Sequence, residues 1–106
     1  MPKYLIKASV TPEGAQGMMK EGGTGRREAV EKLAESAGGS LEALYFAFGE
    51  TDVYSIVDLP DNSAAAALAL TVSSSGAIQT NTVVLMTPEE VDEATRKTVE
   101  YRPPGA

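Results

Sequence analysis

The chain contains no cysteine, no histidine and no tryptophan. These absences exclude disulfides, thiolate chemistry and metal ligation through cysteine or histidine. The imidazole, which usually exchanges protons near neutral pH, is missing as well. We therefore expect no metal and no cofactor, and any acid–base chemistry would fall on carboxylate, lysine or tyrosine side chains.

Long apolar runs and net positive charge are also absent. The longest apolar run, residues 64–70, is far shorter than the roughly 20 residues that span a bilayer. The formal charge of −6 argues against charge-driven binding to nucleic acid or to an acidic membrane. Residues 1–10 lack the charged lead and the cleavage site of a signal peptide. We expect a cytoplasmic protein with neither nucleic acid nor membrane as a partner.

What is present is a succession of strand and helix patterns within 106 residues, the length of one domain. Apolar alternation predicts strands at 3–10 and 77–86, and two more within 41–59 around a tight turn at 49–51. Thr-Pro-Glu at 11–13 and at 87–89 is typical of a helix start. The residues that follow 11–13 form a glycine-rich helical pattern, which Gly22-Gly23 breaks. A second helix is expected from a Thr24 cap to residue 37, a third over residues 64–72, and a terminal helix over residues 88–97.

The order β-α-β-β-α-β-α predicts an α+β, ferredoxin-like βαββαβ fold with a C-terminal helix. Both main helices then cover one face of a four-stranded antiparallel sheet. Residues 1–98 form the expected domain, and 99–106 are a tail. Residues 41–59 are apolar on both faces, with Leu44, Phe46 and Phe48 opposite Leu41, Ala43, Tyr45 and Ala47. We expect another copy to cover the bare face, giving an obligate dimeric α/β barrel.

Three segments carry a resemblance to a known family: KYLIKASVT, EGGTGRREAVEKLAESAGGSLEALYFAFGETDVYSIVDLPD and TNTVVLMTPEEV. Over residues 3–93 the chain resembles the GYD-domain family of small bacterial and archaeal proteins. The resemblance implies a relationship in fold to dimeric α/β barrels. Gly49 and Asp52 match the family's glycine and aspartate at the central hairpin, whereas Thr51 stands where its tyrosine is expected.

Two residues are candidates for catalysis. Lys7 lies in a central strand and faces the open side of the sheet, where it would hold an anion or reach water. Alternatively it would pair with Asp52 or Asp58, on a strand taken to be a parallel neighbour, or with a carboxylate of a partner chain. Asp52 follows the tight turn, so that it is either a general base or ligand group, or an aspartate that binds turn amides. Gly49 in the same turn is expected to supply a positive φ angle.

Further candidates would bind a ligand. Arg26 and its neighbour Arg27, near a helix start, would bind an anion or pair with Glu28 or Glu31. Met18 and Met19, beside glycines, would suit a flexible lid or ordinary packing. Tyrosines could line a pocket beside Lys7 or belong to the core: Tyr4, Tyr45 and Tyr54.

Three functions remain open on these residues. The first is a small-ligand-binding oligomeric domain with a cleft between the open sheet face and the first helix. The second is a cofactor-free isomerase or monooxygenase, which rests on analogy of fold alone. The third is a structural module whose role is assembly.

Overall fold

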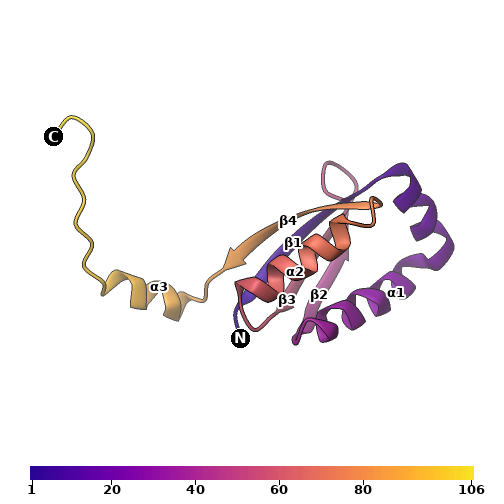
Figure 1. The fold of residues 1–106 in the computed structure, drawn as a ribbon, viewed down its shortest axis with the longest axis horizontal. Coiled ribbons are helices and arrows are strands. Elements are labelled where there is room, and N and C mark those ends of the chain that lie inside the picture. Colours follow the sequence, from indigo (N-terminus) through magenta and orange to yellow (C-terminus); the bar gives the residue numbers. More distant parts are fainter.

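The structure is a computed structural model that describes all 106 residues (Figure 1). Its elements are β1 (Lys3–Val10), α1 (Pro12–Ser36), β2 (Ser40–Phe46), β3 (Val53–Asp58), α2 (Asn62–Ser73), β4 (Ile78–Leu85) and α3 (Pro88–Thr95). The strands lie in the order β2-β3-β1-β4, and every neighbouring pair is antiparallel. The α+β, ferredoxin-like prediction is confirmed. The expectation of a parallel neighbour for β1 is wrong, because both of its neighbours run antiparallel.

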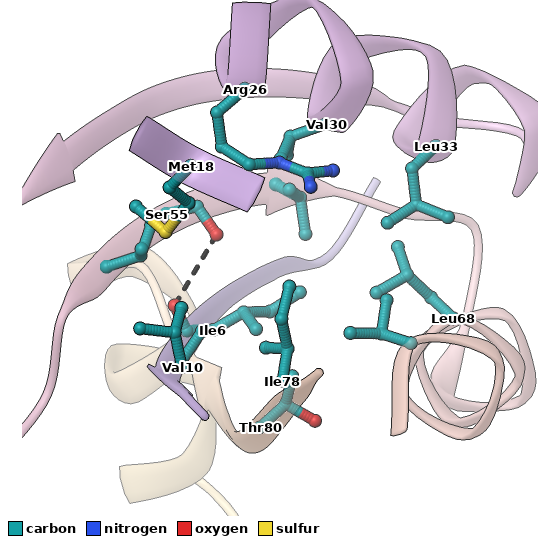
Figure 2. A pocket seen from close by; sticks show the side chains of 14 residues that line it. Ile6, Val10, Met18, Arg26, Val30, Leu33, Ser55, Leu68, Ile78 and Thr80 are labelled. Atoms are coloured by element: carbon teal, nitrogen blue, oxygen red, sulfur yellow. Dashed lines mark hydrogen bonds between the residues drawn. The ribbon is translucent and has the colours of Figure 1, made fainter. Parts of the chain in front are cut away.

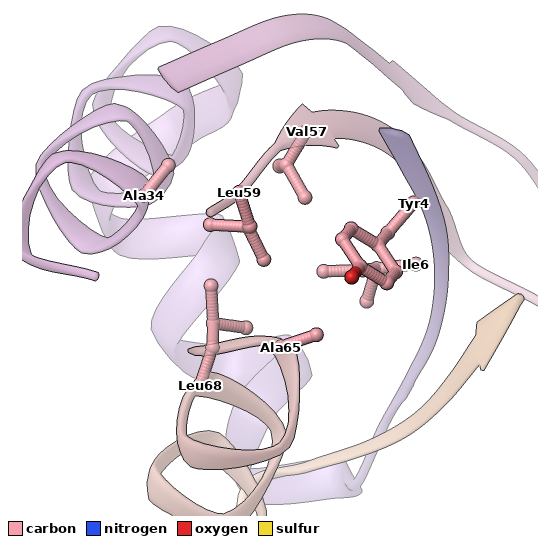
Figure 3. Close-up of a cluster of buried hydrophobic side chains, with 7 residues drawn as sticks. All are labelled: Tyr4, Ile6, Ala34, Val57, Leu59, Ala65 and Leu68. Atoms are coloured by element: carbon pink, nitrogen blue, oxygen red, sulfur yellow. The ribbon is translucent and has the colours of Figure 1, made fainter. Parts of the chain in front are cut away.

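The hydrophobic core lies between one face of the sheet and the helices α1 and α2 (Figure 3). It is small: nine residues of the chain are buried. Ala34 of α1 and Ala65 of α2 are short enough to bring the helix backbones near the sheet. Tyr4 belongs to this core, and its hydroxyl donates a hydrogen bond to Asn62 Oδ1 at 2.6 Å. A modest core of this kind gives limited stability to a single chain.

Helix α1 is kinked at Gly22, whose φ of 75° and ψ of 173° lie outside the helical region. Positive φ is accessible to glycine because it has no Cβ atom. The predicted break is therefore confirmed, since Gly22 divides α1 into two helical segments, but Thr24 lies inside the second segment rather than capping it. Thr11 caps α1 as predicted, with its hydroxyl accepting from Gly14 N–H at 3.2 Å.

A register shift between Leu41 and Ala43 interrupts the pairing of β2 with β3. Because of this bulge, Leu41 pairs with Val57 and packs against the core, whereas strict alternation placed it beside Tyr45 on the open face. The connection to β3 spans residues 47–52 and is longer than the expected tight turn. Gly49 in it has no positive φ, so the expectation for that residue is wrong.

The second face of the sheet carries no helix. Lys7, Leu5 and Ser9 lie on this open face, as alternation in β1 predicted. Tyr45 lies opposite Tyr54 there, and Tyr45 is 72% exposed. One end of the face carries a cluster of charges, where Lys3 Nζ binds Glu42 Oε1 at 2.7 Å and Asp58 Oδ1 at 2.9 Å. These carboxylates raise the pKa of Lys3 above its ordinary value.

The C-terminal arm, residues 88–106, extends away from the sheet (Figure 1). Every residue in it is exposed, including the apolar Val91, Val99 and Tyr101. The arm lengthens the molecule to 56 Å and gives a radius of gyration of 16.8 Å, against about 13 Å for a compact chain of 100 residues. No helix of the protein is both long and apolar enough to cross a membrane.

Candidate functional site

A cavity of about 60 Å³ lies between the kinked helix α1, helix α2 and the covered face of the sheet (Figure 2). Of its 14 lining residues, 11 are hydrophobic. The three others are Arg26, Ser55 and Thr80, which point polar atoms into an otherwise apolar space. An apolar pocket with a few convergent polar groups is the usual form of a small-molecule site.

The cavity exists because short side chains occupy the middle of the covered face. Ala8 of β1 pairs with Val53 on one side and with Thr80 on the other. Ser55 lies opposite Ile6 and donates a long hydrogen bond, 3.4 Å, to the Ile6 carbonyl. None of these side chains reaches α1, so the space beneath Arg26 and Val30 stays unfilled.

Arg26 is the only charged residue in the cavity wall. It arises just after the kink of α1, and its side chain extends along the wall (Figure 2). Its Nε atom is buried and has no hydrogen-bond partner, while a terminal nitrogen lies 3.4 Å from Glu21 Oε1. Of the expected pairings with Glu28 or Glu31, that of Arg27 with Glu31 is confirmed, at 3.7 Å, whereas Arg26 pairs with neither. A buried donor without an acceptor costs about 1–3 kcal/mol.

Two further hollows adjoin the cavity, and Met18 lines all three. The larger, about 390 Å³, opens between the α1 kink and the loop after β2, with Met19, Phe46 and Phe48 in its wall. The smaller, about 180 Å³, is bordered by Glu13 and Glu21. Methionine is flexible and fits irregular spaces. Met18 therefore lies where the cavity and both hollows meet, and its flexibility suits that position.

Asp52 lies at the edge of the larger hollow. Its Oδ2 accepts from Val10 N–H at 2.9 Å, and its own N–H donates to the Ala8 carbonyl at 2.9 Å. Its carbonyl accepts from Ala47 N–H at 2.8 Å. Asp52 thus performs the backbone-binding role expected of a turn aspartate and fixes the loop to the end of β1.

Lys7 is on the opposite side of the sheet from the cavity. It borders a shallow polar hollow of about 360 Å³ together with Ser9, Glu50 and Thr51. Lys7 forms no ion pair in this chain, since Asp58 binds Lys3 and Asp52 binds the Val10 amide. The two carboxylates expected to pair with Lys7 therefore do not.

The predicted ligand-binding residues do not come together in one pocket. Arg26 lines the cavity, Tyr4 is in the core, and three lie on the open face: Lys7, Tyr45 and Tyr54. Ser55, Thr80 and Val30 were not identified from the sequence, although short side chains at covered-face positions of the strands were a signal available there. No group of three or more acidic side chains is placed to hold a metal ion.

Comparison with known proteins identifies one family. The sequence model described as the GYD domain matches residues 4–95 of the chain. No curated protein and no solved structure matches it.

Replacing Asp52 with alanine tests its structural role. The variant leaves the Val10 amide without its acceptor, so we expect the free energy of unfolding to fall by about 1–3 kcal/mol, measured by urea denaturation. Asp52→Asn, which keeps an acceptor oxygen, should lose less than half as much. Unchanged stability in Asp52→Ala would show that the contact with Val10 is dispensable.

Proposed function

The chain belongs to the GYD domain family, and from this premise we propose that it is a homo-oligomeric domain that binds a small molecule between α1 and the sheet. The observation that carries the proposal is the apolar cavity with the unpartnered Arg26 Nε in its wall. A cavity that served packing alone would not gain from placing a guanidinium group there, because burial of an unpaired polar atom destabilises the fold.

The proposed site is not where the sequence suggested. A cleft was expected between the open face and the first helix, but α1 packs on the opposite, covered face of the sheet (Figure 1). The ligand site and the open face are therefore on two sides of one sheet. This arrangement lets a second copy cover the open face without closing the cavity.

Binding accounts for the cavity better than catalysis does. A cofactor-free isomerase or monooxygenase needs a general acid or base that reaches the substrate. Lys7 lies on the far side of the sheet, and Asp52 borders only the larger hollow, where one of its oxygens already accepts from Val10. The inner cavity itself contains Arg26 and two hydroxyl groups as its polar components.

A second copy of the chain is the proposed cover of the open face. Apolar side chains are spread over all four strands of this face: Leu5, Ala43, Tyr45, Tyr54, Ile56, Val83 and Leu85. Lys7 and Glu50 border one hollow there, and neither forms an ion pair within the chain. When two such faces pack about a two-fold axis, Lys7 of each copy can meet Glu50 of the other, so the face is complementary to itself in charge.

The C-terminal arm supports the same assembly. It continues from the edge strand β4, extends away from the sheet, and exposes Val91, Val99 and Tyr101. Ordering a segment of this length is unfavourable in entropy unless contacts compensate. We place the arm along the second copy, beside the paired sheets.

Replacing Tyr45 with aspartate tests the dimer. A charge at this position, on the edge strand β2 and within the apolar surface of the open face, should dissociate the oligomer into folded monomers of 11.1 kDa, measured by light scattering at low micromolar concentration. Leu70→Asp on α2 is a matched control, because Leu70 and Tyr45 are both 72% exposed in the chain. A wild-type monomer, or equal dissociation by the two variants, would refute the dimer on this face.

Filling the cavity tests the ligand site. We expect wild-type protein incubated with a small-molecule extract of its source cells to gain a ligand mass in native mass spectrometry, and Val30→Phe to gain none, because the larger ring occupies the space. Ala67→Phe, on the exposed side of α2, should bind as the wild type does. Circular dichroism confirms folding, since overpacking costs about 1–3 kcal/mol. Absence of a ligand mass in the wild type, or equal binding by Val30→Phe, would contradict the proposal.

A further inference from the structure

We propose that the ligand is a small carboxylic acid with an apolar body, bound with its carboxylate on Arg26. The inference rests on the proposed ligand site and specifies what that site takes. It follows from the hydrogen-bonding state of Arg26, from the charges around the cavity and from the shapes of the adjoining hollows.

The guanidinium group of Arg26 has N–H donors that are not used in hydrogen bonds within the chain. Its contact with Glu21 is at 3.4 Å and involves one terminal nitrogen, while Nε is buried and unpaired. Nε and the other terminal nitrogen form one side of the planar fork, which matches the two oxygens of a carboxylate through parallel N–H···O bonds. A neutral ligand with one acceptor would satisfy only part of this fork.

The surrounding charges determine how the ligand lies. Arg26 also borders the smaller hollow, but Glu13 and Glu21 line it as well, so that two carboxylates repel an anion there and an apolar body finds little to contact. The larger hollow presents Met19, Phe46 and Phe48. We therefore place the carboxylate in the inner cavity at Arg26 and direct the apolar body past Met18 towards the two phenylalanines.

The same charges favour a single negative charge on the ligand. Glu13, Glu21 and Asp52 all border the hollows around Arg26, and the chain carries a net charge of −6. A dianionic phosphate ester would bring two negative charges into this field, whereas a carboxylate brings one to an Arg26 that Glu21 contacts through a single terminal nitrogen, at 3.4 Å. The cavity of about 60 Å³ also suits the smaller head group, since a water molecule takes up about 30 Å³ of liquid.

The experiment uses octanoate as the probe, with 1-octanol and octyl phosphate as matched compounds, in calorimetric titrations of the full chain. We expect octanoate to bind at least tenfold more tightly than either. Arg26→Gln keeps most of the side-chain stem and should weaken octanoate at least tenfold while leaving octanol unchanged. Arg26→Lys keeps the charge but loses the planar fork, so its affinity for octanoate should lie between those of the wild type and Arg26→Gln. The control is Arg27→Gln, the exposed neighbour, which should bind as the wild type does.

The outcomes separate this inference from the proposed function. Equal affinity for octanoate and octanol, tighter binding of octyl phosphate, or full octanoate affinity in Arg26→Gln overturns the carboxylate while leaving the ligand site in place. Failure of wild-type protein to bind octanoate also overturns it, and the cell-extract measurement then decides whether the site takes another ligand. If no compound from the extract binds either, the proposed function is refuted together with the carboxylate inference.

Discussion

The rest of the structure depends on how two helices cover a four-stranded sheet. Right-handed crossovers place α1 and α2 on the same face, and α3 extends away from the sheet, so the other face stays uncovered. The covered face holds the core and the cavity, while the open face presents its apolar side chains to water. In the proposed account one sheet serves two purposes, ligand binding on its covered face and assembly on its open face. Neighbouring residues of β1 illustrate this, because Ala8 lies on the covered face and Lys7 on the open face.

Within the covered side, the bend in α1 and the short strand residues act together. A straight helix over long side chains would have filled the interface at the density of a protein interior. The positive φ of Gly22 turns α1, and Ala8 and Ser55 do not reach it. Arg26 follows the bend and is held against the cavity with its Nε buried. Such an arrangement lowers the stability of the free protein, and under the proposed function a ligand that satisfies the guanidinium group would restore it.

Much of the fold could be predicted because the signals are local. Alternation in β1, the Thr-Pro starts of α1 and α3, and the glycines at the kink each act within a few residues. The errors concern contacts that only the assembled sheet defines. Because of the bulge, Leu41 packs against the core. The antiparallel register places Asp58 opposite Lys3 rather than Lys7. Arg26 pairs with Glu21, on the other side of the kink, instead of with a residue at helical spacing. The cavity is likewise defined by residues from five elements, and only Met18 and Arg26 were identified beforehand as candidates.

The central claim is that the ligand and the second copy occupy opposite faces of the sheet. The most direct measurement is a crystal structure of the wild-type protein with bound octanoate. The account predicts density for the carboxylate beside Arg26, with Met18 displaced and the open face buried against another copy. Octanoate on the open face beside Lys7, with the cavity unchanged, would contradict it.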